Sequence, residues 1–301
     1  MSIRIAISTL VVLAALLGTL YAVGRIMIAR VETVDASTLA PLPGAKFLQT
    51  RSGRVHCLDV GEGPPVLLMH GSGRSIVDWQ QGVVQRLSRD HRVIAFDYYG
   101  NGFSERNPAF TYGYDLWVQE AVDLLDALHV KHVTVVGQSV GGALACILAA
   151  DHPTRVDHVV TIGTGMAIEP QQLLPAVPGV GEILFANVSS FGETYSDDHR
   201  RALEASFKVR GTRAALLQYM RRQMTIDGLR LLFGVFEDVN VPVLHISGSR
   251  DNHISPDAAR ALARRTNGTF VLVEGVGHNV QIEAPGRTVQ EIEKFLAGDT
   301  P

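Results

Sequence analysis

The chain from 132 to 150 joins a β-branched run, a Gly-x-Ser-x-Gly turn and an alanine-rich stretch without interruption. This order predicts a buried strand, a sharp turn centred on Ser139 and a helix, which is an arrangement found in parallel sheets. Gly137 and Gly141 lack a Cβ, so the neighbouring backbone can pack closely and leave the serine hydroxyl exposed. An ordinary turn between a strand and a helix has the same pattern. A nucleophilic role for Ser139 therefore depends on partners elsewhere in the chain.

Short apolar segments alternate with helical patterns along most of the chain. Seven strands are expected besides the one before Ser139: Phe47–Arg51, Arg54–Val60, Pro65–His70, Arg92–Phe96, Val156–Ile162, Val241–Ser247 and Thr269–Glu274. Ser52-Gly53 separates the first two and is typical of a hairpin, and residues 115–128 have a helical apolar period. This alternation predicts an α/β fold with a doubly wound, mostly parallel eight-stranded sheet that is covered on both faces.

The strand pattern stops between Met166 and about Asn240, where helix-like sequence is broken by prolines. We interpret residues 166–240 as a helical lid over the carboxyl edge of the sheet, where ligands bind in open α/β folds. Residues 45–165 and 241–301 are then the two parts of the core, and residues 31–44 form a linker. The lid is rich in apolar side chains, which favour an apolar substrate if they line a cavity.

The segment from Ile5 to Gly24 has no charged residue and lies between Arg4 and Arg25. As a helix it spans about 30 Å, the thickness of the hydrocarbon core of a bilayer. A cleavable signal has a shorter apolar stretch, of about 7–15 residues, and ends in a small-x-small site that is poorly matched here. A buried core helix is disfavoured because the segment has no polar face. We expect residues 1–30 to be a membrane anchor or an uncleaved signal, with the side of the membrane left open by nearly balanced charges.

Charge and cysteine content argue against two other classes of function. The net charge of the 301 residues is −3, and no basic stripe with interleaved aromatic residues occurs, so we expect no nucleic-acid partner. Cys57 and Cys146 are the only cysteines. We expect both to be small buried apolar groups, and the chain to hold neither a metal site nor another cofactor.

A glycine-rich loop, His70-Gly71-Ser72-Gly73, follows one of the expected strands. A tetrahedral oxyanion needs at least two preorganised donors, and backbone amides of such a loop can approach it without steric cost. The amides of Ser72 and Val140 would supply them. A tight turn without a catalytic role is the alternative.

Two more polar residues follow the last two expected strands. Asp251 is placed to orient an imidazole ring, unless it is a surface aspartate that caps the helix near Ser255, a role that Asp257 could also take. His278 taken alone is as consistent with a structural role as with a catalytic one. Serine, aspartate and histidine in this chain order, each at a strand end, favour a catalytic triad over three separate structural roles.

Residues 45–298 resemble the α/β-hydrolase superfamily. The resemblance is carried by H-G-S-G at 70–73, D-Y-Y-G-N-G-F-S at 97–104, G-Q-S-V-G-G at 137–142 and G-V-G-H-N-V-Q-I-E-A-P at 275–285. It implies that Ser139 is the nucleophile, that His278 is general base and then acid, and that Asp251 orients His278. It also implies that the amides of Ser72 and Val140 form the oxyanion hole.

Within the superfamily, the chain is similar to single-pass-anchored hydrolases of the monoacylglycerol lipase type. It is also similar to microbial serine esterases and C–C bond hydrolases. Asp97 matches a family motif in which the aspartate is usually structural. Ser139 occupies the position at which epoxide hydrolases and haloalkane dehalogenases have aspartate, which argues against both of those activities.

These residues predict a serine hydrolase that cleaves carboxylic esters, with apolar or lipid-like groups, through an acyl-enzyme. Two alternatives stay open. A C–C hydrolase of a vinylogous diketone has the same triad and takes substrates with carboxylates, so Arg74 or Arg210 facing the cavity would support it. A ligand-binding pseudohydrolase is the second alternative, although all three triad positions are filled.

Overall fold

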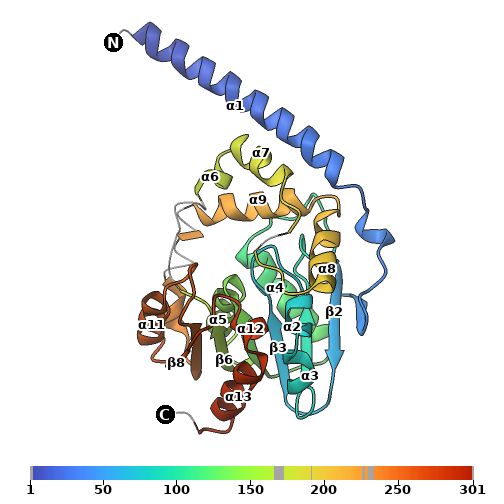
Figure 1. Ribbon diagram of the computed structural model, residues 1–301, viewed down its shortest axis with the longest axis vertical. Helices are drawn as coiled ribbons and strands as arrows, with labels where there is room; N and C mark the ends of the chain where they lie inside the picture. Colours follow the sequence, from blue (N-terminus) through green and yellow to red (C-terminus); the bar gives the residue numbers. More distant parts are fainter. Residues whose placement is uncertain (1–2, 166–172, 191, 226–227, 230–233, 300–301) are drawn as a thin grey trace.

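A computed structural model describes residues 3–165, 173–190, 192–225, 228–229 and 234–299. At its centre is one eight-stranded sheet with the order β1-β2-β4-β3-β5-β6-β7-β8. The first two pairings, β1 with β2 and β2 with β4, are antiparallel, and the other five are parallel. This confirms the predicted α/β fold class with its mostly parallel eight-stranded sheet (Figure 1).

The strands occupy the segments expected from their apolar runs. They are β1 Ala45–Gln49, β2 Arg54–Val60, β3 Pro65–Met69, β4 Arg92–Phe96, β5 Val133–Gln138, β6 Val156–Ile162, β7 Val243–Gly248 and β8 Thr269–Val273. Two of them are shifted by two residues from the prediction: β1 begins earlier than Phe47, and β7 begins later than Val241. Pro242 accounts for the second shift, because proline has no N–H to donate to a neighbouring strand.

Helices cover both faces of the sheet, so alternate residues of one strand lie in different cores. In β3, Leu67 and Met69 pack into the core that contains α4 and α5, whereas Val66 and Leu68 pack into the core that contains α3 and α13. A strand buried on both faces must be apolar throughout, as β3 is. The core helices are α2 Val77–Gln80, α3 Val83–Leu87, α4 Tyr114–Ala127, α5 Val140–Asp151, α11 Pro256–Arg265, α12 Val280–Glu283 and α13 Pro285–Leu296.

Between β6 and β7, the described residues of the expected lid form helices above the sheet (Figure 1). These are α6 Leu173–Ala176, α7 Val180–Ala186, α8 Asp197–Phe207 and α9 Thr212–Gln223. The 3₁₀ helix η3 Val235–Asp238, at the end of the expected lid, packs instead against the core helices α5 and α11. The lid segment packs on α2, which follows β3, and on the loop that leaves the carboxyl end of β4. His199 of α8 contacts Asp78, and a Cβ at Gly100 would lie 2.5 Å from that of Ala215 in α9. Residues 166–172 of the expected lid lie outside the described residues.

The N-terminal segment is one helix, α1 Ile3–Val31. It is long and apolar enough to cross a membrane, and most of its side chains are exposed. Its last turns pack on the lid, where Gly24, Ile28 and the adjoining Glu32 are buried. The linker that follows is also partly ordered, since it contains the short 3₁₀ helix η1 Ala36–Thr38 and a bridge between Val34 and Val209.

Candidate active site

Ser139 lies in a strained turn between β5 and α5. Its backbone has φ 53° and ψ −116°, a left-handed region in which a side chain costs about 1–3 kcal/mol. The flanking glycines make this turn possible. A Cβ at Gly137 would lie 2.1 Å from the carbonyl oxygen of Gly141, and one at Gly141 would lie 2.1 Å from that of Met69. Only glycine fits at either position, as the sequence pattern predicts.

Asp251 and His278 are joined by a hydrogen bond. His278 Nδ1 lies 2.8 Å from Asp251 Oδ2, and the carboxylate side chain is fully buried whereas the ring is 14% exposed. The other carboxylate oxygen, Oδ1, accepts hydrogen bonds from the backbone amides of His253 and Ile254 at 2.9 and 2.8 Å. Asp251 therefore has a fixed orientation that presents one oxygen to the imidazole ring.

The alternative role of Asp251 as a helix cap is taken by another residue. The Ser255 side chain accepts a hydrogen bond from the amide of Ala258 and caps α11. Asp257, the other candidate for this cap, is exposed and pairs with Arg260 on the surface of that helix. Neither aspartate therefore caps α11, and Asp251 contacts His278 instead.

The turn at the end of β6 contacts both Ser139 and His278. The amide of Ser139 donates to the carbonyl of Ile162 at 2.8 Å, and the Thr164 hydroxyl donates to the carbonyl of Ser139 at 3.0 Å. At Gly163, between those two residues, a Cβ would lie 2.8 Å from the carbonyl oxygen of His278 and 3.1 Å from its Nδ1. The three residues of the expected triad are thus brought to one edge of the sheet, although they are far apart in the sequence.

The two amides expected to form an oxyanion hole belong to adjoining segments. Gly141, in the first turn of α5, packs against the carbonyls of Met69 and His70, directly before the loop that contains Ser72. Within the described ranges, neither the Ser72 amide nor the Val140 amide donates to an acceptor in the protein. Val140 is the first residue of α5, where backbone N–H groups lack helical partners and favour negative charge. Both amides are therefore free to bind an anion.

The buried Asp97 holds several loops together below this site. Its carboxylate accepts from His56 Nδ1 at 2.7 Å and from the amides of Ile76 and Phe103 at 2.8 Å each. Burial opposes its ionisation, but the His56 ring and these donors hold the pKa of Asp97 below its usual value. Asp97 thus has the structural environment that the family motif implies.

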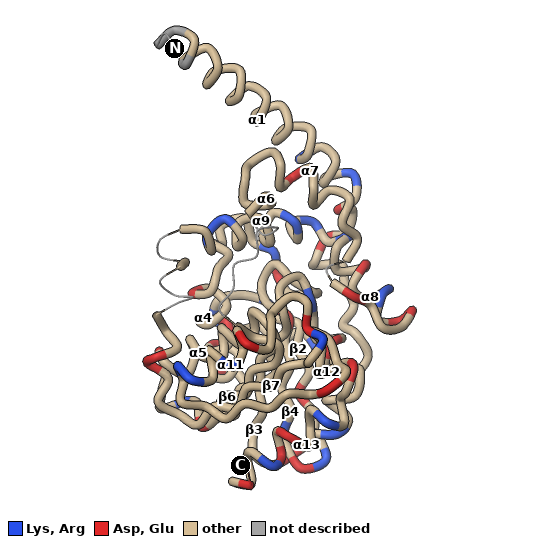
Figure 2. Tube along the Cα trace, turned by 60° about the vertical axis from the view of Figure 1, so that its left-hand side comes forward, with Lys and Arg blue, Asp and Glu red and all other residues tan. Residues whose placement is uncertain are grey.

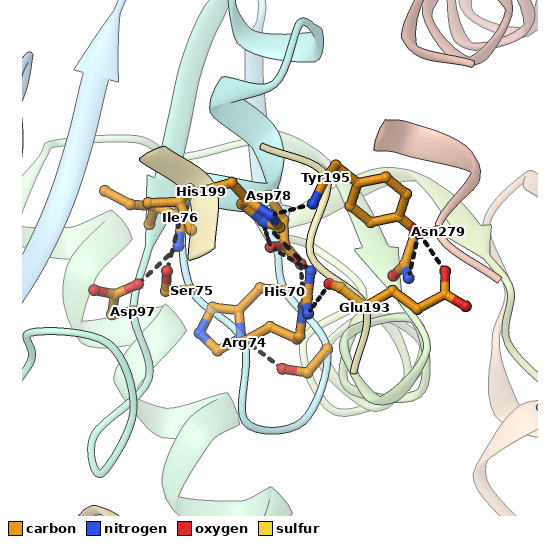
Figure 3. Close-up of polar contacts among 12 residues, drawn as sticks. His70, Arg74, Ser75, Ile76, Asp78, Asp97, Glu193, Tyr195, His199 and Asn279 are labelled. Atoms are coloured by element: carbon orange, nitrogen blue, oxygen red, sulfur yellow. Dashed lines mark hydrogen bonds and ion pairs between the residues drawn. The ribbon is translucent and has the colours of Figure 1, made fainter. Parts of the chain in front are cut away.

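Arg74, which the sequence left as a candidate for binding a substrate carboxylate, has a carboxylate partner within the protein (Figure 3). Its guanidinium binds both oxygens of Asp78 at 2.8 and 2.9 Å, and it donates to the backbone carbonyl of Glu193 at 2.9 Å. His199 of α8 contacts the same aspartate at 2.9 Å. Charge interaction with Arg74 and the hydrogen bond from His199 hold the pKa of Asp78 below its usual value, against the effect of burial. These buried residues fasten the lid to the loop after β3.

Arg210, the other candidate, lies outside this region. Its side chain is 57% exposed and pairs with Asp35 in the linker at 2.8 Å. Neither arginine that the sequence suggested therefore offers an uncommitted guanidinium to a substrate.

A second lid contact lies next to His278. The Asn279 amide donates to the Tyr195 hydroxyl at 3.0 Å, and that hydroxyl donates to Glu283 or Glu193 at 3.1 and 3.0 Å (Figure 3). Burial raises the pKa of Tyr195. The sequence does not indicate roles for Tyr195 and His199, because no motif links the lid to residues about 80–120 positions away.

Metal ligation finds no support among the described residues. They contain no group of three His, Cys, Asp or Glu side chains that could hold a metal ion. Cys57 and Cys146 are buried and unpaired with each other, and burial raises the pKa of each thiol to about 12. Both cysteines are therefore inert apolar groups, as expected.

Comparison with known proteins identifies the family. Residues 64–190 match the model of the alpha/beta hydrolase fold. A 2-hydroxymuconate semialdehyde hydrolase of Pseudomonas sp. (strain CF600) is 31% identical over 256 residues, which cover 81% of this chain and 90% of the relative. A 2-hydroxy-6-oxo-2,4-heptadienoate hydrolase of Pseudomonas putida is 31% identical over 80% of this chain and 92% of its own.

A solved structure of similar shape is that of a meta-cleavage product hydrolase from Pseudomonas fluorescens IP01. It has a TM-score of 0.67 and 23% identity, and the match covers 84% of this chain and 97% of the other. The similarity to monoacylglycerol lipase-type hydrolases stays a prediction. The strained serine turn, the sheet order and the relatives that match over most of their length together show that this chain belongs to the α/β-hydrolase fold family.

Proposed function

We propose that the protein is a serine hydrolase in which Ser139, His278 and Asp251 form the catalytic triad. The observation that carries the proposal is the 2.8 Å contact between His278 Nδ1 and Asp251 Oδ2, beside the turn that also contacts Ser139. Asp251 holds the ring with Nδ1 protonated, which leaves Nε2 free to act as a base. The strained turn keeps the Ser139 hydroxyl at the carboxyl edge of the sheet.

The reaction then proceeds in two steps. Nε2 of His278 takes the Ser139 proton while the serine oxygen forms a bond to the substrate carbonyl, and the oxyanion accepts hydrogen bonds from the amides of Ser72 and Val140. The intermediate collapses to an acyl-enzyme as His278 protonates the leaving group. A water molecule, deprotonated by His278, then attacks the acyl-enzyme and restores the Ser139 hydroxyl.

We propose an uncharged carboxylic ester with an apolar acyl group as the substrate. Arg74 supports this choice, because its guanidinium is 5% exposed and both oxygens of Asp78 neutralise it. A substrate carboxylate placed there would have to displace Asp78 from a buried pair. The apolar α1 next to the lid also favours an ester that partitions into membranes.

Hydrolysis of a C–C bond is the second candidate. It is favoured by the relatives, which are 31% identical and whose names specify 2-hydroxymuconate semialdehyde and a 2-hydroxy-6-oxo-dienoate as substrates. Both reactions begin at a carbonyl and use the same triad, so the sequence similarity supports the chemistry of Ser139 in either case.

We further propose that residues 5–24 are a membrane anchor that is retained in the mature protein. The support is the packing of the helix end: Gly24, Ile28 and Glu32 are buried against the lid. Cleavage after the apolar segment would remove Gly24 and uncover part of the lid surface that it contacts.

The test combines labelling of the nucleophile with a comparison of substrates. We expect a fluorophosphonate probe to label the full-length protein and Ser37→Ala, whose side chain is exposed, but not Ser139→Ala. Labelling that persists in Ser139→Ala would refute the triad. Turnover of p-nitrophenyl esters of increasing acyl length is then compared with turnover of a 2-hydroxy-6-oxo-dienoate. A higher kcat/KM for the dienoate would overturn the ester proposal in favour of C–C hydrolysis, and no turnover of either would favour a binding protein.

A further inference from the structure

Exposed large apolar side chains are confined to two neighbouring parts of the described structure. One is α1 itself. The other is the segment from α6 to α7, where Leu173, Leu174, Val177 and Leu184 are 37–57% exposed. The lid helices α8 and α9 do not contribute to this set. A patch of exposed apolar residues beside a possible membrane span marks a surface that another apolar phase covers.

Helix α7 and the turn before it pack along α1 in the same direction, and α6 packs on α7, where a Cβ at Gly181 would lie 2.1 Å from the carbonyl oxygen of Pro175. A Cβ at Gly179, before α7, would lie 2.6 Å from the carbonyl oxygen of Leu17 and 3.1 Å from the Tyr21 amide. One at Gly24 would lie 2.4 Å from the Cβ of Glu182, within α7. The start of α7 therefore lies toward the N-terminal end of α1, and its later residues lie toward the charged end that begins at Arg25 (Figure 1).

This packing sets the depth of the segment relative to the apolar helix. No Lys or Arg occurs between Arg4 and Arg25, and the first basic residues after the apolar stretch lie beside α7 (Figure 2). If Gly24 lies at the edge of the hydrocarbon, Leu17 and Tyr21 lie about 5–10 Å inside it at 1.5 Å per residue. Gly179 contacts α1 at that level. Amphipathic segments that lie in a membrane surface reach a similar depth of about 5–10 Å.

A buried ion pair fixes the lid to the end of α1. Glu32 accepts from the amides of Gly211 and Arg213 at 2.7 Å each, and so caps the N-terminus of α9, which has no cap of its own. The Arg213 guanidinium lies 3.4 Å from the same carboxylate, and both side chains are buried. The bridge between Val34 and Val209 adds a second connection. Because of these contacts, α1 cannot cross a bilayer without bringing the lid to its surface.

We propose that the α6–α7 segment is a membrane-docking surface, inserted by Leu173 and Leu174 into the lipid that α1 crosses. This rests on the proposed anchor role of α1. The occupant is lipid rather than a protein partner, because the apolar patch is continuous with α1 at a depth where lipid surrounds that helix. The lid over Ser139 thereby faces the bilayer, which is where an apolar ester would be concentrated.

The test measures the depth of single labelled residues in phosphatidylcholine vesicles. The full-length chain carries Leu174→Cys with an environment-sensitive fluorophore. Asp198→Cys, at an exposed position of α8, is the matched lid control, and Leu13→Cys reports on the anchor. Both native cysteines are buried, so the introduced thiol alone reacts. We expect lipids that carry a doxyl quencher in the acyl chain to remove emission at positions 174 and 13 but not at 198.

If the label at position 13 is quenched but the label at 174 is quenched no more than that at 198, the docking surface is refuted and the anchor is retained. An absence of quenching at both 13 and 174 would overturn the anchor and the docking surface together. The emission wavelength at position 174 could instead depend on the protein-to-lipid ratio without quenching by the lipid. That result would overturn lipid docking, because it indicates that a second copy of the chain covers the patch. None of these results changes the assignment of the triad, which fluorophosphonate labelling tests separately.

Discussion

Replacing Asp251 by asparagine tests the proposed triad most directly, because the structure predicts how the amide will lie. Oδ1 of Asp251 accepts from two backbone amides, and only an oxygen can keep both bonds. Turning the asparagine over would set its NH₂ group against those donors and lose two buried hydrogen bonds. At about 1–3 kcal/mol each, fewer than about one molecule in thirty would adopt that orientation.

The NH₂ group of the asparagine would therefore face Nδ1 of His278. Nδ1 must then accept a hydrogen bond, so the proton moves to Nε2 and the ring can no longer take a proton from Ser139. In Ser-His-Asp enzymes of other folds, the wrong tautomer lowers kcat by about 10⁴, or about 5.5 kcal/mol in activation free energy. We expect a loss of this size in Asp251→Asn, measured as the rate of acylation by a chromogenic ester.

The control is Asp257→Asn, on the surface of α11, where the side chain is 94% exposed. It should keep the wild-type rate. Asp251→Asn should also keep the wild-type melting temperature within a few degrees, because the side chain is nearly isosteric. A folded Asp251→Asn protein with less than about a tenfold loss of rate would refute the role of Asp251.

Three further predictions concern the structure around the site. Gly141→Ala places a Cβ 2.1 Å from the carbonyl oxygen of Met69, so we expect this variant to lose ester turnover while it still melts cooperatively. Wild-type turnover would contradict the tight packing of α5 on that loop. Glu32→Ala leaves Arg213 buried without its carboxylate, which should lower the free energy of unfolding by about 3–5 kcal/mol and lower the melting temperature in detergent. An unchanged melting temperature would argue against the contact between the end of α1 and the lid. Burial lowers the pKa of His245 to about 4, whereas the pKa in the unfolded chain is about 6.5. The unfolded state therefore binds more protons between pH 6.5 and 4, and the free energy of unfolding should fall by up to about 3 kcal/mol over that range. Denaturant titrations at several pH values should show a smaller fall of the unfolding free energy in His245→Asn than in the wild type. An equal pH dependence in the two proteins would refute the role of His245.

The strands and the serine turn are determined by local sequence. The β-branched run before Ser139 and the two glycines around it restrict the backbone over a few residues, so the pattern alone predicts the strand, the turn and the helix. The triad could be proposed for a related reason. The carboxyl ends of parallel strands meet at one edge of a sheet, so residues that follow different strands converge there.

Only the tertiary structure decides which polar groups finally pair. Asp251 and Asp257 both follow β7 within a few residues. The path of the backbone places the Asp251 carboxylate against His278 and leaves that of Asp257 in solvent. The sequence leaves Arg74 as a candidate ligand for a substrate carboxylate. In the structure Arg74 pairs with Asp78, and both contact His199 in a lid helix more than 100 residues away.

The N-terminal helix shows the same division. Its length and lack of charge are local properties, and they predict an anchor. The packing of its last turns on α7 and the capping of α9 by Glu32 depend on segments about 150–180 residues apart, which no periodic pattern in the chain specifies. The sequence by itself thus determined the kinds of element and their chemistry. The contacts among distant elements decided that α1 and the lid are one packed unit above Ser139.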